Sequence, residues 1–160
     1  MERDFRWDTL EDTRHFGRSL GGLLRGGDLV VLTGDLGAGK TTLTQSIGEG
    51  LGVRGPITSP TFVISRVHPS LVGGPLLVHV DAYRLGSAIE LDDLDLDADL
   101  DASVAVIEWG AGLAEQLSDE RLELTLAGDD VRTARLTAVG ARWQALLAEL
   151  ADTSAGAVPG

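Results

Sequence analysis

The chain has 160 residues, 43% of them hydrophobic, and a formal net charge of −12, which suits one globular domain rather than several. Its basic residues form no cluster that could follow a phosphate backbone, so we do not expect tight direct binding to DNA or RNA. Three scattered histidines and no cysteine disfavour a zinc site and exclude disulfides. Without an apolar run of about 18 residues or a secretory signal, we expect a cytoplasmic protein that spans no membrane.

The first part of the chain predicts a strand, a helix and a second strand. DFRW has the composition of a short strand, and Asp8 and Glu11 have capping-box spacing for a helix that runs to about Arg25, where two glycines stop it. The run DLVVLTG, residues 28–34, is apolar and ends in a turn glycine. Such a run is typical of a strand buried on both faces, at the centre of a parallel sheet.

The next segment, GDLGAGKTT, fits the pattern G-x-x-x-x-G-K-[ST] between that strand and a helix predicted over residues 39–51. Its glycines allow successive backbone N–H groups to point at a phosphate, and the start of the helix adds its positive dipole end. Lys40, the only lysine of the chain, would reach the β- and γ-phosphates. The hydroxyl of Thr41 is an oxygen ligand suited to Mg²⁺. We therefore predict nucleotide binding here.

The middle of the chain predicts a hairpin and a third buried strand. ITSPTFVISRV (57–67) indicates a loop and then a strand, and LLVHVD (76–81) indicates its partner. Ser87 and Glu90 have the spacing of a capping box for a short helix. SVAVIE (103–108) follows as a strand of the buried type.

Two of these strands end in a carboxylate, as a nucleotide-bound Mg²⁺ requires. Asp81 and Glu108 would lie at the same edge of a parallel sheet as the phosphate loop, although the pattern leaves open which acid touches the metal and which acts through water. In the Asp-rich run 90–108, four acids fall at positions 1, 3, 5 and 12 of an EF-hand loop: Asp97, Asp99, Asp101 and Glu108. However, Ala102 stands where the sharp turn needs glycine and an apolar strand follows, so we interpret the run as a solvated acidic surface.

The last part of the chain predicts an antiparallel hairpin and a helix. RLELTLA (121–127) and VRTARLTAV (131–139) alternate apolar and polar residues around Gly128, as strands with one solvated face do. ARWQALLAEL (141–150) predicts a closing helix. We expect one domain over residues 1–151 and a disordered tail over residues 152–160.

The identity of the base and the class of reaction depend on what the chain lacks. It contains no asparagine, so the N-K-x-D motif that reads guanine in GTPases cannot be formed, and adenine is the expected base. A kinase for a small metabolite remains an alternative, with Arg84, Arg132 and Arg135 available for a lid. A module whose binding is gated by nucleotide but that hardly hydrolyses it is a third possibility.

Three stretches together carry a family resemblance: GDLGAGKTT (34–42), SPTF (59–62), and HVDAYRL (79–85) followed by IEW (107–109). In this order and spacing, over about residues 8–145, the chain resembles the TsaE (YjeE) family. These are small bacterial P-loop ATPases required for threonylcarbamoyl modification of adenosine in tRNA. The resemblance implies an α/β fold, the three-layer sandwich of P-loop NTPases, whose sheet has a parallel centre and antiparallel additions.

The resemblance also implies roles for individual residues. Lys40 would act on the phosphates, Thr61 in the switch-like SPTF loop would lie near the γ-phosphate, and Asp81 would help to position the hydrolytic water or couple the switch to hydrolysis. Thr41 and Glu108 would be the Mg²⁺ ligands. The residues implied to contact ATP are Asp35, Gly37, Ala38, Gly39, Lys40, Thr41, Thr42, Glu11 (with its neighbours to Thr13) and Arg132.

The implied partners are proteins rather than a metabolite. Family members have low intrinsic ATPase activity and act with the TsaB–TsaD pair, so tRNA would be reached only indirectly, through that complex. Gly110 and Ala111 depart from the family pattern, which often has a second acid shortly after E-W. The alternative for Arg132, that it is an ordinary surface arginine of a hairpin, stays open at this point.

Overall fold

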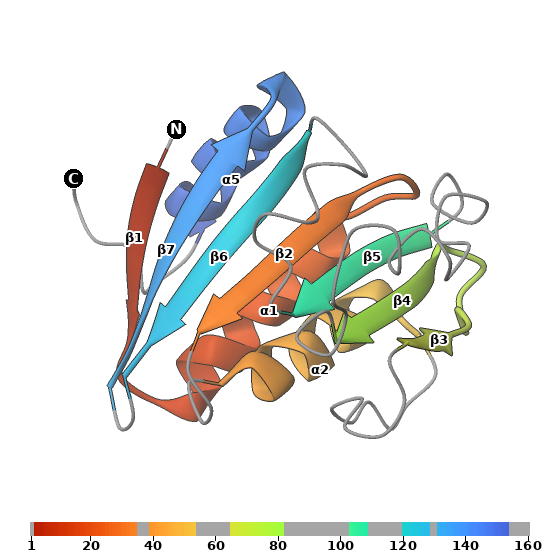
Figure 1. The fold of residues 1–160 in the computed structure, drawn as a ribbon, viewed down its shortest axis with the longest axis horizontal. Coiled ribbons are helices and arrows are strands. Elements are labelled where there is room, and N and C mark those ends of the chain that lie inside the picture. Colours follow the sequence, from red (N-terminus) through yellow and green to blue (C-terminus); the bar gives the residue numbers. More distant parts are fainter. Residues whose placement is uncertain are drawn as a thin grey trace.

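The computed structural model describes residues 2–34, 39–53, 65–81, 103–108, 120–128 and 131–153. Seven strands of this described part form one sheet, and three helices pack against it (Figure 1). The strands are β1 (Glu2–Trp7), β2 (Leu29–Gly34), β3 (Ser65–His68), β4 (Leu76–Asp81), β5 (Ser103–Glu108), β6 (Arg121–Ala127) and β7 (Arg132–Val139). The helices are α1 (Leu10–Leu23), α2 (Lys40–Leu51) and α5 (Ala141–Thr153).

The sheet has the order β1-β7-β6-β2-β5-β4-β3. Its centre is parallel, because β2 pairs with both β5 and β6, and β5 also pairs with β4. Antiparallel strands complete both sides, with β7 and β1 beyond β6, and β3 beyond β4. The parallel centre and antiparallel additions expected from the sequence are confirmed. The apolar runs of β2 and β5 lie at the centre, where both faces of a strand are covered.

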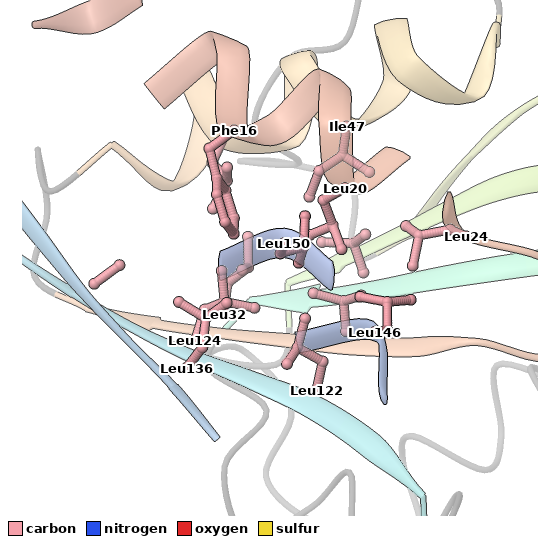
Figure 2. Packing of buried hydrophobic residues seen from close by; sticks show 14 of the residues in the cluster. Phe16, Leu20, Leu24, Leu32, Ile47, Leu122, Leu124, Leu136, Leu146 and Leu150 are labelled. Carbon is pink, nitrogen blue, oxygen red and sulfur yellow. The ribbon is translucent and has the colours of Figure 1, made fainter. Parts of the chain in front are cut away.

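All three described helices cover one face of the sheet, and their apolar side chains form one core with it (Figure 2). Phe16 and Leu20 of α1, Ile47 of α2, and Leu146 and Leu150 of α5 meet in this core. Trp143 is buried in the same cluster, as its place on the last amphipathic helix predicts. Among the described residues no helix covers the opposite face, so the expected third layer of the sandwich is not part of what the structure describes.

Glycines let α1 and α2 approach more closely than side chains would permit. A Cβ atom at Gly21 of α1 would lie 2.3 Å from the carbonyl oxygen of Ile47, and one at Gly50 of α2 would lie 2.3 Å from the carbonyl oxygen of Arg18. Both distances are far inside van der Waals contact with backbone atoms that cannot move aside alone. The helix that begins at the phosphate loop is therefore held against α1 by backbone contact.

The start of α1 corrects one expectation. The capping box is formed by Thr9 and Asp12, not by Asp8 and Glu11. Thr9 Oγ1 accepts a hydrogen bond from the Asp12 backbone N–H at 3.1 Å, and Asp12 Oδ2 accepts one from the Thr9 N–H at 3.2 Å. Asp8 instead accepts a hydrogen bond from Arg6 at 2.7 Å, which occupies its side chain just after β1. The two residue pairs have the same spacing. Asp8 follows β1 directly and is bonded to Arg6, so the next pair forms the box.

The turn from α1 into β2 is fastened by a buried ion pair. Asp28 accepts two hydrogen bonds from Arg142 of α5, at 2.9 Å and 2.5 Å, and a third from the backbone N–H of Arg25 at 2.8 Å. The hydrogen bond to Asp28 raises the pKa of Arg142. The helix α1 ends at Leu23, two residues before the expected end, because the chain turns here to satisfy Asp28.

Several sequence predictions lie outside the described residues, among them the short helix opened by Ser87 and the acidic run 92–101. The final helix extends through Thr153, beyond the predicted 141–150, and residues 154–160 lie outside the described part. Within that part, no helix combines the length and the apolar character needed to cross a membrane.

Candidate functional site

The phosphate loop joins the end of β2 to the start of α2, at the edge where the parallel strands end. Lys40 is the first residue of α2, and its side chain turns back so that Nζ donates a hydrogen bond to the carbonyl oxygen of Gly34 at 2.7 Å. Only 6% of Lys40 is exposed. Its ammonium group is therefore held between the start of α2 and the end of β2, where the sequence pattern predicts a phosphate-binding lysine.

Two positions of the loop can hold only glycine without disturbance. Gly39 has φ of 101°, in the left-handed region, and a Cβ atom there would lie 3.1 Å from Arg132 Nη1. A Cβ atom at Gly34 would lie 2.6 Å from the carbonyl oxygen of Leu126, on the neighbouring strand β6. Close approach of β6 and β7 to the loop thus explains why these glycines are needed.

The first turn of α2 offers backbone donors and hydroxyl groups. Its N-cap, Gly39, has no side chain to cap the helix, so the first N–H groups remain available to an anion. Thr41 and Thr42 are half-buried on this turn. Thr44 and Ser46, further along, donate instead to carbonyl oxygens of the helix, each at 2.9 Å. The threonines at the start of the helix therefore suit a ligand, and the later hydroxyl groups serve the helix.

The two predicted carboxylates end neighbouring strands. Asp81 of β4 stands opposite Glu108 of β5 in the parallel register, and Glu108 stands opposite Leu32 of β2, two residues before the phosphate loop. Glu108 is only 4% exposed, so it is not an ordinary solvated strand end. The prediction that both acids stand at the same edge of the parallel sheet is confirmed.

One residue of this cluster was missed by sequence reasoning. His79 of β4 is wholly buried, and its Nε2 atom lies 2.5 Å from Glu108 Oε2. The signal was present in the sequence, because His79 precedes Asp81 by two residues and residues two apart on a strand share a face. The spacing of the three histidines along the chain predicts no role for His79.

A second group of buried polar atoms lies beside the loop. Arg132 packs against Gly39, and its buried Nε and Nη1 atoms have no hydrogen-bond partner among the described residues. Its register partner Trp7 has a buried Nε1 atom that is likewise unpaired. Trp7 packs on Phe16 with ring centroids 5.0 Å apart, and Thr13, one helical turn before Phe16, has an unpaired hydroxyl. Unpaired polar atoms in one region are costly unless a ligand satisfies them.

This geometry bears on the predicted adenosine contacts. Arg132 lies against Gly39, and its buried guanidinium atoms rule out a purely exposed hairpin arginine; Thr13 is buried on α1. Glu11, by contrast, is exposed and forms an ion pair with Arg18 at 2.5 Å. The other predicted contacts Asp35, Gly37, Ala38 and Thr61 lie outside the described residues.

No group of three or more His, Asp or Glu residues that could hold a metal occurs within the part of the chain that the structure describes. A magnesium ion bound with a nucleotide does not need one, because it takes one or two protein oxygens and completes its shell with phosphates and waters. The hydroxyl of Thr41 and the carboxylate of Glu108 are oxygen donors of the kind that Mg²⁺ prefers. The donor set at the end of the sheet therefore fits this ion.

Comparison with known proteins shows the family to which the chain is similar. Residues 7–136 match the family model described as threonylcarbamoyl adenosine biosynthesis protein TsaE. The chain is 58% identical over 137 residues to the tRNA threonylcarbamoyladenosine biosynthesis protein TsaE of Streptomyces coelicolor, over 81% of this chain and 93% of that protein. It is 39% identical over 153 residues to the protein of the same name from Bacillus subtilis, over 92% and 94% of the two chains.

A solved structure gives the same result for the fold. The crystal structure of Bacillus subtilis YdiB superposes with a TM-score of 0.75 at 35% sequence identity, over 95% of each chain. The sequence match, the matching fold and the phosphate loop at the sheet edge agree with one another. The chain belongs to the TsaE family.

Proposed function

We propose that this protein is a Mg²⁺-dependent ATPase that acts in the threonylcarbamoyladenosine modification of tRNA, in the cytoplasm and together with TsaB and TsaD. The observation that carries the proposal is the position of the buried Lys40. Its ammonium group, at the start of α2, donates a hydrogen bond to the carbonyl oxygen of Gly34, at the end of β2, at 2.7 Å. A phosphate bound at the start of α2 would accept hydrogen bonds from this ammonium and from the first N–H groups of the helix.

The metal would be held by Thr41 and Glu108, and it would supply charge neutralisation at the β- and γ-phosphates. His79 engages Glu108 Oε2, and the Glu108 carboxylate would be the acidic protein ligand of the metal. Asp81 stands beside Glu108 in the register, which supports a role in orienting the hydrolytic water. Hydrolysis then depends on positioning and electrostatics rather than on covalent chemistry by the protein.

The nucleoside would be satisfied by the unpaired polar atoms beside the loop. Arg132 offers two unpaired donors next to Gly39, Trp7 offers one, and Thr13 offers a hydroxyl that both donates and accepts. The chain lacks the asparagine of the guanine-reading motif, which supports adenine. The predicted contact at Glu11 finds less support, since that carboxylate already pairs with Arg18.

Action through protein partners is supported by the names of the relatives and by charge. The relatives from Streptomyces coelicolor and Bacillus subtilis are named tRNA threonylcarbamoyladenosine biosynthesis proteins. A chain with a net charge of −12 repels a phosphate backbone, so contact with tRNA would be made by the TsaB–TsaD pair. The kinase alternative loses one of its candidate lid arginines, because Arg135 pairs with Asp4 at 3.0 Å across β1 and β7.

The test is ATP turnover by the purified chain alone, with the TsaB–TsaD pair, and with that pair plus tRNA. We expect weak intrinsic turnover that the partners stimulate. Lys40→Met should weaken ATP binding about 10- to 100-fold, since it removes a charge-assisted hydrogen bond worth about 1.5–3 kcal/mol. Arg6→Gln, which removes a surface positive charge, is the matched control and should bind normally. Turnover stimulated by a small metabolite that becomes phosphorylated would favour the kinase instead.

A second variant tests the nucleoside contacts. Arg132→Leu removes two buried donors and should weaken ATP binding at least about tenfold, because even one hydrogen bond to a charged group contributes about 1.5–3 kcal/mol. Binding of inorganic triphosphate, which lacks the nucleoside, should change much less. Equal losses for ATP and triphosphate would place Arg132 on the phosphates.

A further inference from the structure

His79 is the most buried ionisable side chain at the candidate site, and its surroundings call for an explanation. It lies on β4 with no exposed surface, between the apolar Val78 and Val80. Among the described residues its hydrogen-bond partner is Glu108, at 2.5 Å from Nε2 to Oε2, and the other ring nitrogen, Nδ1, has none there. Burial of an imidazole with one unpaired nitrogen is costly, so a leucine would fill this space more favourably.

The contact fixes the chemistry of both groups. A carboxylate oxygen that accepts at this distance needs a hydrogen on Nε2, which assigns the tautomer protonated at that nitrogen. Glu108 is 4% exposed, and a carboxylate so deeply buried needs a donor to compensate for its lost hydration. One of its two oxygens is thus held by β4, and the orientation of the carboxylate is set from the neighbouring strand.

We infer that His79 is a positioning residue that holds the Glu108 carboxylate in the orientation that binds Mg²⁺. The inference rests on the proposed function, which makes Glu108 a metal ligand. Because the donor comes from a neighbouring strand of the same parallel sheet, Glu108 is oriented before any ligand arrives. Residues that hydrogen-bond to a metal-binding side chain, rather than to the metal itself, typically account for about 10- to 100-fold in metal affinity.

The test compares two amide substitutions of His79. In His79→Gln the amide nitrogen reaches the place of Nε2, whereas in His79→Asn it reaches only the place of Nδ1 and cannot meet Glu108. Binding of a non-hydrolysable ATP analogue is measured by calorimetry at a series of Mg²⁺ concentrations and in EDTA. We expect His79→Asn to need about 10- to 100-fold more Mg²⁺ for half-maximal tight binding, with binding in EDTA unchanged. His79→Gln should stay close to the wild type.

Two controls separate positioning from structural damage. His68→Asn changes another buried histidine, on β3, and should leave the Mg²⁺ dependence unchanged. In a Glu108→Gln background, His79→Asn should have no further effect on Mg²⁺ dependence, because its action passes through that carboxylate. A loss in EDTA as large as that in Mg²⁺, or equal Mg²⁺ dependence in His79→Asn and His79→Gln, would overturn the inference.

A measurement on the unaltered protein covers the case in which the variants do not fold. Nitrogen NMR of the wild type should show a proton on Nε2 of His79, and a ring protonated on Nδ1 alone would overturn the inference. The failure of the proposed function has a different signature: the wild type itself would show no Mg²⁺-dependent nucleotide binding. If the wild type binds the nucleotide with Mg²⁺ and His79→Asn matches it, only the positioning role is wrong.

Discussion

Substitution of Gly21 by alanine tests the close approach of α1 and α2. The new Cβ atom would lie 2.3 Å from the carbonyl oxygen of Ile47, about 1.1 Å inside the 3.4 Å at which ordinary contact begins. Both atoms belong to helix backbones, so α1 and α2 must separate or shift to relieve the overlap. Overpacking of this kind costs about 1–3 kcal/mol.

The same substitution also has a favourable effect, which must be removed from the comparison. Alanine is a better helix former than glycine by up to about 1 kcal/mol in a helix interior. Gly22, the next residue of α1, provides the control, because a Cβ atom there meets nothing within 4 Å. Gly22→Ala should therefore stabilise the protein by about 0.5 kcal/mol, less than the full propensity difference since it lies near the end of the helix.

The two variants should move the free energy of unfolding in opposite directions. We expect Gly21→Ala to be less stable than Gly22→Ala by about 1–3 kcal/mol, the overpacking cost alone, measured as the shift of the urea midpoint at constant slope. Gly50→Ala, on the other side of the same contact, should behave like Gly21→Ala, because its Cβ atom would lie 2.3 Å from the Arg18 carbonyl oxygen. Equal stability of Gly21→Ala and Gly22→Ala would refute the close packing of the two helices.

Two further predictions concern ion pairs in different environments. Arg142→Met leaves Asp28 buried without its bidentate partner. We expect the free energy of unfolding to fall by about 2–3 kcal/mol, below the 3–5 kcal/mol of a fully buried pair because the arginine is partly exposed. An unchanged stability in urea unfolding would contradict this. At the sheet edge, the hydrogen bond from Arg135 lowers the pKa of Asp4, so its stabilisation is present above the unfolded value of 3.8 and is lost as the pH falls through the lower folded pKa. Arg135→Met should raise the pKa of Asp4 in an NMR titration, and an unchanged value would show that the pair does not persist in solution.

The sequence by itself determined the type of most elements and their order along the chain. Continuous apolar runs predicted the buried strands β2 and β5, alternation predicted the hairpin of β6 and β7, and glycine spacing around Lys40 predicted the phosphate loop. The ends of two such strands also brought Asp81 and Glu108 together, because parallel strands end at the same edge. These are local patterns, whose meaning depends on neighbours a few residues away. The family resemblance, which rests on such short motifs, was confirmed for the same reason.

Only the tertiary structure decided which distant residues meet. The strand order β7-β6-β2 brings Arg132, on β7, against Gly39, which follows β2. The pairing of β4 with β5 places His79 against Glu108. No periodicity encodes these contacts, because strand order follows from the burial of whole faces by segments far apart in the chain. The choice of Thr9 as the helix cap shows the same limit at short range. The sequence determined where Lys40 and Glu108 stand along the chain, and folding decided which side chains contact them.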